Sequence, residues 1–327
     1  MLEMLINPPL AVSFDAFTDI DFWTGVGILA GTYTIFALGL QVNVGFTGIY
    51  NFGQAGFMAI GAYTMAILVT DHGFSFWLSL PIAILVAVLF GLLVGLPSLR
   101  LRSDYFAIAT IAAAETIRIV AVNARDLTGG PNGIFGFSDD WDSLSESIQN
   151  GISDLGWTDV PRLMPLLLVV WAVAVVLMFV LTRVQNTPWG RVLRAIREDE
   201  DAARALGKNA FSYKLQSLAI SAALAAVAGF FLALNLKFVV PDEFLPIFTF
   251  TGYSVLVLGG LANYWGVAIG SIIIWTVLEG LRFLGLPLEE VQIAALRFIL
   301  LGLTLILLMA FRPQGMFGKR EEMVLGE

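Results

Sequence analysis

The sequence predicts an all-α protein, a polytopic transmembrane helical bundle with about eight to ten membrane segments, some of them broken or re-entrant. Hydrophobic residues make up 58 % of the 327 residues and charged residues only 13 %, whereas a soluble domain carries about 25 % charged residues. Several apolar runs reach the roughly 20 residues that a helix needs to cross the hydrocarbon core. Because these runs have helical length, and lipid leaves backbone groups no partners outside regular structure, we expect helices.

Seven apolar runs have the length of single spans. They cover residues 23–42, 52–69, 76–99, 105–122, 163–183, 213–236 and 294–311. A further apolar stretch, 248–284, is interrupted by "GGLANYWG" and is too long for one crossing. We expect it to form two shorter segments that meet at a turn, which brings the total to about nine.

The Lys and Arg residues predict which loops face the cytoplasm. The region 183–214 holds seven basic residues, whereas the loop 123–161 holds seven acidic residues and only Arg125 as a base. Since basic loops stay inside, we expect a cytoplasmic coupling loop at 184–212 and an outer loop at 123–161. The transmembrane domain then spans 23–311, with an extracytoplasmic N-terminal segment at 1–22 and a cytoplasmic tail at 312–327. The acidic residues 1–22, which hold no Lys or Arg, predict no cleavable signal peptide.

The stretch 187–207, "TPWGRVLRAIREDEDAARALG", predicts one charged cytoplasmic helix. Thr187 is suited to the N-cap, Pro188 to the first helical position and Gly207 to a left-handed end. Its modest apolar face would comprise Val192, Leu193, Ile196, Ala203 and Leu206. Such a helix could lie on lipid headgroups or dock onto a partner protein. The four consecutive acids 198–201 favour docking, because a lipid-bound helix rarely keeps them.

The segment "DAARALG" (201–207) resembles the cytoplasmic coupling loop of ABC importer permeases, which seats a short helix in a groove of the ATPase. Other stretches carry the resemblance further: "NVGFTGIYNFGQAGFMAIGAYTMAIL" (43–68), "RLRSDYFAIATIAAAETIRIV" (100–120), "LTGGPNGI" (127–134), "VLGGLANYWGVAIGSIII" (257–274) and "RPQGMFG" (312–318). In this order they resemble the LivM-type permease subunit of branched-chain amino-acid ABC importers. One departure lies at 218–221, where Leu-Ala-Ile-Ser replaces the Ile-x-Leu-Pro of the wider permease pattern.

The resemblance implies an ABC importer permease in the cytoplasmic membrane, surrounded by lipid, that translocates branched-chain or other apolar amino acids. It also implies a homologous LivH-type permease as heterodimer partner, two ABC ATPase subunits that carry ATP and Mg, and an extracytoplasmic solute-binding protein. The residues that we expect to couple to the ATPases are Arg194, Arg197, Glu198, Asp199, Glu200, Asp201, Ala202, Ala203 and Gly207.

The chain offers no residues for catalysis of its own. A phosphate-binding loop needs Gly-Lys followed by Ser or Thr, but Gly207-Lys208 and Gly318-Lys319 precede Asn and Arg. The sequence has no Cys and a single His, so we expect neither a metal site nor a resident cofactor. The net charge of −8 argues against binding of nucleic acid. We therefore expect a transport subunit rather than an enzyme.

Polar residues at membrane depth predict the path of the solute. Gln41, Asn43, Thr47, Asn51 and Gln54 are interleaved with glycines between two apolar segments. Broken helices are tolerated in a bilayer where they line a cavity or are buried in protein. These residues therefore line the translocation path or, alternatively, bond to neighbouring helices while the glycines permit close packing.

Charged residues within the spans are further candidates for the path. Glu115 and Arg118 are three residues apart, as are Glu279 and Arg282, a spacing that brings side chains together on one helix face. Such a pair either meets the solute or its binding protein, or is structural. Arg297 has no obvious local partner, so its bond reaches another helix or the sister subunit.

Three other functions are compatible with the residues. Permeases of this type also serve urea and short amides, and nothing in 41–56 separates a zwitterion from a neutral amide. An ion-driven secondary carrier would hold unpaired acids at mid-membrane, whereas the acids found here have basic neighbours at helical spacing. A structural or channel-like subunit would show no nucleotide-dependent interaction at the cytoplasmic loop.

Overall fold

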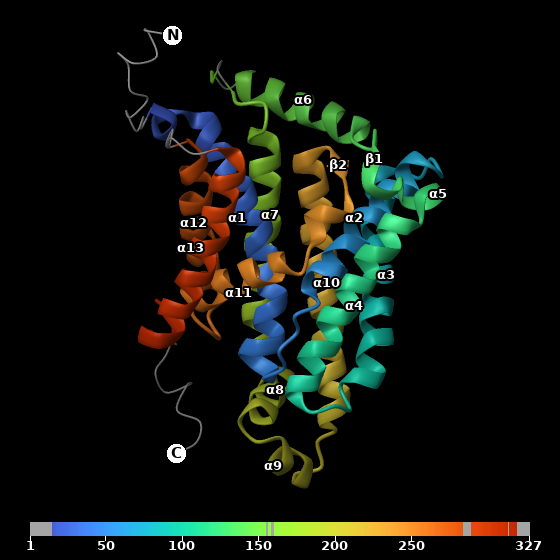
Figure 1. Cartoon of the computed structure of the whole chain (residues 1–327), viewed down its shortest axis with the longest axis vertical. Coiled ribbons are helices and arrows are strands. Elements are labelled where there is room, and N and C mark those ends of the chain that lie inside the picture. Colours follow the sequence, from blue (N-terminus) through green and yellow to red (C-terminus); the bar gives the residue numbers. More distant parts are fainter. Residues whose placement is uncertain (1–14, 155, 158–159, 284–288, 313, 319–327) are drawn as a thin grey trace.

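The computed structural model describes residues 15–154, 156–157, 160–283, 289–312 and 314–318. The described chain forms an elongated bundle of α-helices (Figure 1). The α-helices are α1 Ile20–Leu40, α2 Gln54–Thr70, α3 Phe76–Ser98, α4 Ser103–Asn123, α5 Arg125–Thr128, α6 Asp139–Asp154, α7 Met164–Gln185, α8 Pro188–Glu198, α9 Glu200–Ala205, α10 Ala210–Leu236, α11 Ile247–Gly259, α12 Tyr264–Phe283 and α13 Glu290–Phe311. Short 3-10 turns are η2 Asp15–Thr18, η4 Gly130–Asn132 and η5 Pro241–Phe244, and η3 Gln41–Thr47 is a π-helix.

The predicted membrane segments are confirmed within the described residues. Seven helical stretches are long and apolar enough to cross a membrane, and α2 and α11 are shorter apolar helices. The stretch 248–284 divides as predicted, because α11 ends at Gly259 and α12 begins at Tyr264. Residues 284–288 lie outside the described residues, as do 1–14 and 319–327 of the predicted terminal segments.

Two helices form the centre of the bundle. In α1 and α10, 83 % of the most apolar window is buried inside the chain, whereas α13 has no buried residue. α10 packs against α1, α2 and α3, and α1 also contacts α7, α11 and α12. In Figure 1, α12 and α13 lie on one side of α1 and α7, and α3 and α4 lie on the other. The polar residues buried on these two helices therefore lie in the protein interior.

The two ends of the bundle differ. One end carries α6 and a two-stranded antiparallel sheet of β1 Ile134–Phe135 and β2 Phe238–Val239, in which Ile134 pairs with Val239. Lys237, at the end of α10, forms an ion pair of 2.7 Å with Asp142 of α6. The opposite end carries α8 and α9 (Figure 1). The loops 123–161 and 184–212 therefore lie at opposite ends, as their predicted sides of the membrane require.

Candidate functional site

The coupling loop forms two helices, so the prediction of one helix over 187–207 is wrong. α8 ends at Glu198 and α9 begins at Glu200, because Asp199 adopts an extended backbone with φ −154° and ψ 104°. The Asp199 carboxylate accepts a hydrogen bond of 2.9 Å from the Ala202 amide. An Asp N-cap followed by acids in the first turn is a favourable helix start. The run of acids therefore begins a second helix instead of continuing the first.

The predicted ends of the loop agree only in part with the structure. The Thr187 backbone takes the N-cap conformation, but its hydroxyl donates to the Val184 carbonyl oxygen at 2.6 Å and caps nothing. Gly207 has the predicted left-handed backbone, with φ +77°.

Two arginines of α8, Arg194 and Arg197, turn toward the membrane segments. The Arg197 guanidinium donates to the carbonyl oxygen of Gly45, which lies in the π-helix η3. Arg194 donates to the Gln185 carbonyl oxygen at the end of α7, at 3.1 Å. Leu193 and Ile196 are buried beside them. α8 is therefore fastened to the break between α1 and α2 by a charge-assisted hydrogen bond.

α9 is held by an acid of its first turn. The Glu200 carboxylate forms ion pairs with Lys214 of α10 and, at 2.6 Å, with Arg204. Ala203 is buried against Ile196 and Ala210. Leu206, expected on the apolar face, is instead 80 % exposed.

The residues predicted to couple to the ATPases thus fall into two groups. Arg194, Arg197, Glu200 and Ala203 face the chain itself. The others are exposed and, together with Leu206, form what we call the docking surface: Glu198, Asp199, Asp201, Ala202, Leu206 and Gly207. An exposed leucine among acids is suited to a protein interface, where an apolar centre is ringed by charges.

The polar residues between α1 and α2 are all buried. Gln41, Asn43, Asn51 and Gln54 are 0 % exposed and Thr47 is 2 % exposed. The chain runs through η3, turns at Gly48, which has φ +73°, and reaches α2 at Gln54. The predicted break in the membrane segment is therefore confirmed, and its side chains point into the protein.

Gln54 joins three segments through hydrogen bonds. Its amide nitrogen donates to the carbonyl oxygens of Phe36 at 3.3 Å and Ser221 at 3.2 Å. Its amide oxygen accepts from the Ser221 hydroxyl at 2.8 Å and from the Asn51 amide at 3.0 Å. The side chain ties α1 and α10 to the start of α2, where the freed backbone of a broken helix needs partners.

A second set of hydrogen bonds involves Ser217, which lies one turn before Ser221 on α10. The Ser217 hydroxyl donates to the Asn43 side-chain oxygen at 2.9 Å, and the Thr47 hydroxyl donates to Ser217 at 2.8 Å. With its amide oxygen turned toward the loop 261–263, Gln41 accepts from the backbone amide of Asn263 at 2.6 Å. These contacts match the alternative interpretation, in which the amides bond to neighbouring helices.

Ser217 and Ser221 were missed by the sequence reasoning. Their signal was a spacing of four residues within an otherwise apolar helix, which places both hydroxyls on one face. Polar residues on such a face are expected to meet polar residues of another helix.

Replacement of Gln54 by alanine is expected to lower the free energy of unfolding by about 2–3 kcal/mol. The change leaves the buried Ser221 hydroxyl and Asn51 amide without a partner, and each unsatisfied group costs about 1–3 kcal/mol. Tryptophan fluorescence during heating of the detergent-solubilised protein measures the effect. The control is Asn150→Ala, which removes an amide side chain at an exposed position of α6, and equal melting of the two variants would contradict the assignment.

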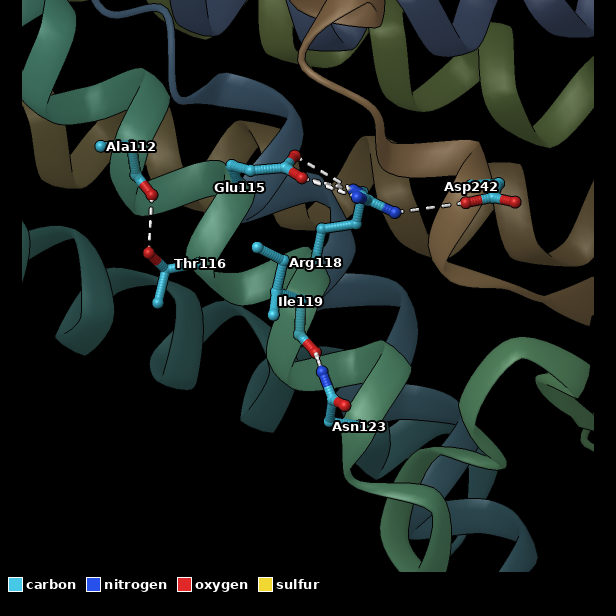
Figure 2. Close-up of polar contacts among 7 residues, drawn as sticks. All are labelled: Ala112, Glu115, Thr116, Arg118, Ile119, Asn123 and Asp242. Carbon is cyan, nitrogen blue, oxygen red and sulfur yellow. Dashed lines mark hydrogen bonds and ion pairs between the residues drawn. The ribbon is translucent and has the colours of Figure 1, made fainter.

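Glu115 and Arg118 form the predicted pair and add a third partner (Figure 2). The Arg118 Nη2 and Nε atoms lie 2.6 Å and 3.0 Å from the Glu115 oxygens. Its Nη1 lies 3.3 Å from the exposed carboxylate of Asp242 in η5. Arg118 therefore links α4 to the segment that precedes α11. No spacing in the sequence indicates the contact with Asp242.

The predicted pairing of Glu279 with Arg282 is wrong. Glu279 of α12 forms its ion pair with Arg297 of α13, at 3.4 Å, and not with Arg282. Arg282 is exposed and makes no ion pair with any described residue. A long arginine side chain from a neighbouring helix reaches the half-buried acid, so interhelical packing overrides the local spacing. The expectation that Arg297 bonds to another helix is confirmed.

Comparison with known proteins identifies the family. Residues 24–309 match the family model of the branched-chain amino acid transport system permease component. The chain belongs to this family. It is a permease subunit and a multi-pass membrane protein, in agreement with its apolar helices.

Several curated relatives resemble the permease over most of its length. The high-affinity branched-chain amino acid transport system permease protein LivM of Escherichia coli is 36 % identical over 306 residues, 89 % of this chain and 69 % of the relative. The probable LivM permease of Methanocaldococcus jannaschii is 27 % identical and covers 92 % of this chain and 94 % of its own. The Escherichia coli LivH permease is also 27 % identical, over 90 % of this chain and 93 % of its own. No solved structure matches the chain.

Proposed function

We propose that the permease is a subunit of an ATP-driven importer that carries branched-chain or other apolar amino acids across the cytoplasmic membrane. The names of the LivM and LivH relatives support this solute class. The partners in this proposal are a LivH-type permease, two ATPase subunits that bind and hydrolyse ATP with Mg, and an extracytoplasmic solute-binding protein.

The observation that carries the proposal is the way the docking surface is fastened to the membrane segments. Its residues are exposed on α9, while Arg197 reaches η3 and Glu200 reaches α10. When the ATPases close, α8 and α9 move as a unit, and these two bonds carry the motion to the break between α1 and α2. The buried polar residues Gln41, Asn43, Thr47, Asn51 and Gln54 hold that break and thereby control the path through it.

The sides of the membrane follow from the same proposal. The α8/α9 end faces the cytoplasm with its basic residues, and the α6 end faces outward with its acidic loop. The N-terminus is then outside and the C-terminus inside. Glu115, Arg118 and Asp242 lie in the outward half of the bundle, where they meet the solute or its binding protein.

Arg197→Met tests the transmission step. The variant is expected to keep the ATPases bound but to lower transport at least about tenfold, because a charge-assisted hydrogen bond is worth roughly 1.5–3 kcal/mol. The measurement is amino-acid uptake together with ATP hydrolysis in proteoliposomes. Arg191→Met, at an exposed position of the same helix, is the control. Equal uptake by the two variants would contradict the transmission role.

The first test of the function is purification of the tagged permease from its native membrane in mild detergent. Co-purification of a second permease and an ATPase, with ATP hydrolysis, is the expected result. A permease that purifies alone and inert would favour the ion-driven carrier. Competition of leucine uptake by urea or acetamide in the reconstituted importer would favour the amide permease instead.

A further inference from the structure

A cavity separate from the coupling region lies among α1, α10, η5, α11, α12 and α13. Its volume is about 440 Å³, within the range of ligand pockets in proteins. Its wall includes Leu236, which ends α10, and Glu279 near the end of α12. The cavity therefore lies in the half of the bundle nearer α6, the half from which an imported solute would arrive.

Most of the cavity wall is apolar. Leucine and phenylalanine side chains from α1, α10, α11 and α13 line it, and the Trp275 ring contacts the Tyr33 ring at a tilt of 54°, with ring centroids 4.7 Å apart. Binding of an aliphatic side chain there would be favourable in proportion to the apolar surface that it removes from water. The wall thus suits a small apolar group.

Two hydrogen-bond donors in the wall lack acceptors. The indole Nε1 of Trp275 and the guanidinium Nε of Arg297 are buried and have no hydrogen-bond partner among the described residues. Buried donors are almost always paired, because an unpaired one has lost its hydrogen bond to water without a replacement. A ligand carboxylate would bring two acceptor oxygens to these donors, and an arginine next to the site favours an anionic group.

The cavity also contains an acid without a partner. Glu243 of η5 lies in the wall, and its carboxylate forms no ion pair or hydrogen bond with a described residue. Burial and the neighbouring Asp242 raise the pKa of Glu243, so its ionised form would be favoured by an incoming cation. Glu279 is already paired with Arg297.

The charges of the cavity balance. Glu243 and Glu279 are matched by Arg282 and Arg297 in the same wall. A net-neutral site with separated acidic and basic groups suits a zwitterion better than an anion or a cation alone. A lipid acyl chain or a neutral amide would leave the acid Glu243 without a charged partner.

We propose that this cavity binds a zwitterionic apolar amino acid. Its carboxylate accepts from Trp275 and Arg297, its ammonium group faces Glu243, and its aliphatic side chain packs on the apolar wall. The choice of ligand rests on the proposed import of apolar amino acids. The site itself rests on the unpaired groups described above.

Titration of tryptophan fluorescence with leucine tests the site. The sample is the assembled importer purified without its solute-binding protein, so that any binding belongs to the membrane part. We expect leucine to cause a saturable change in fluorescence that is absent in Trp275→Phe and present in Trp265→Phe. Trp265 is a suitable control because it lies on the same helix but outside the cavity wall. A change that persists in Trp275→Phe, or no change in the unaltered importer, would overturn the proposal.

Analogues that lack one charge test the orientation. In the unaltered importer, 4-methylpentanoate, which lacks the ammonium group, and isoamylamine, which lacks the carboxylate, should each bind at least about tenfold more weakly than leucine. Arg297→Gln should reduce the difference in affinity between leucine and isoamylamine. Glu243→Gln should reduce the difference in affinity between leucine and 4-methylpentanoate. Unchanged differences in affinity in these variants, or tighter binding of acetamide than of leucine, would overturn the proposal. A general defect in folding cannot produce these selective changes.

Uptake by the importer reconstituted with its binding protein separates the two proposals. Leucine uptake that is equal in the unaltered importer, Arg297→Gln and Glu243→Gln would overturn the cavity site and leave the proposed function standing. Absence of leucine uptake by the unaltered importer would contradict the proposed function, whatever the titration shows.

Discussion

Replacement of Gly229 by valine is expected to prevent folding of the bundle. Gly229 lies in α10 where the helix touches α2, and a Cβ atom there would sit well inside the contact distance of the Met58 carbonyl oxygen. Neither backbone can give way without separating two central helices. Since overpacking of a rigid core costs about 1–3 kcal/mol and backbone separation adds to it, we expect a loss above about 4 kcal/mol.

The measurement is the yield of monodisperse protein after detergent extraction, followed by its melting temperature. Gly302→Val is the matched control, because Gly302 lies within α13 and a Cβ atom there would meet nothing within 4 Å. We expect the control to change the free energy of unfolding by less than about 0.5 kcal/mol. Similar yields of the two valine variants would show that α2 and α10 do not pack as described.

Replacement of Ala202 by tryptophan is expected to abolish stable binding of the ATPase subunits. Ala202 is exposed on α9 beside Asp201, whose side chain is 95 % exposed. An indole ring there would hold a partner surface away from the whole helix, so we expect at least about a hundredfold loss of affinity, or roughly 2.7 kcal/mol. The Ala202 amide keeps its bond to Asp199, so α9 itself should persist.

Co-purification of the ATPases with the tagged permease measures this effect. Ser147→Trp places the same ring at an exposed position of α6, at the opposite end of the bundle, and should leave ATPase binding unchanged. If Ala202→Trp retains the ATPases and normal uptake, the docking surface lies elsewhere.

The apolar runs determined the number and the order of the membrane segments. Lipid offers no partners to the backbone, so a run of sufficient length becomes a helix whatever its neighbours are. Local chemistry also indicated the break after α1 and the split before Tyr264, where polar and glycine-rich stretches interrupt the hydropathy. The i, i+3 pair of Glu115 and Arg118 was likewise predictable, because both residues lie on one helix face.

Only the tertiary structure decided the partners of the polar side chains. Gln54 and Ser221 are 167 residues apart in sequence, and Glu279 pairs across two helices with Arg297 rather than with its neighbour on α12. The turn of Arg197 toward Gly45, away from the docking surface, depends on how α8 lies beneath η3. Hydropathy and capping act within a few residues. The partner of a hydrogen bond or ion pair at membrane depth depends instead on which helices pack together.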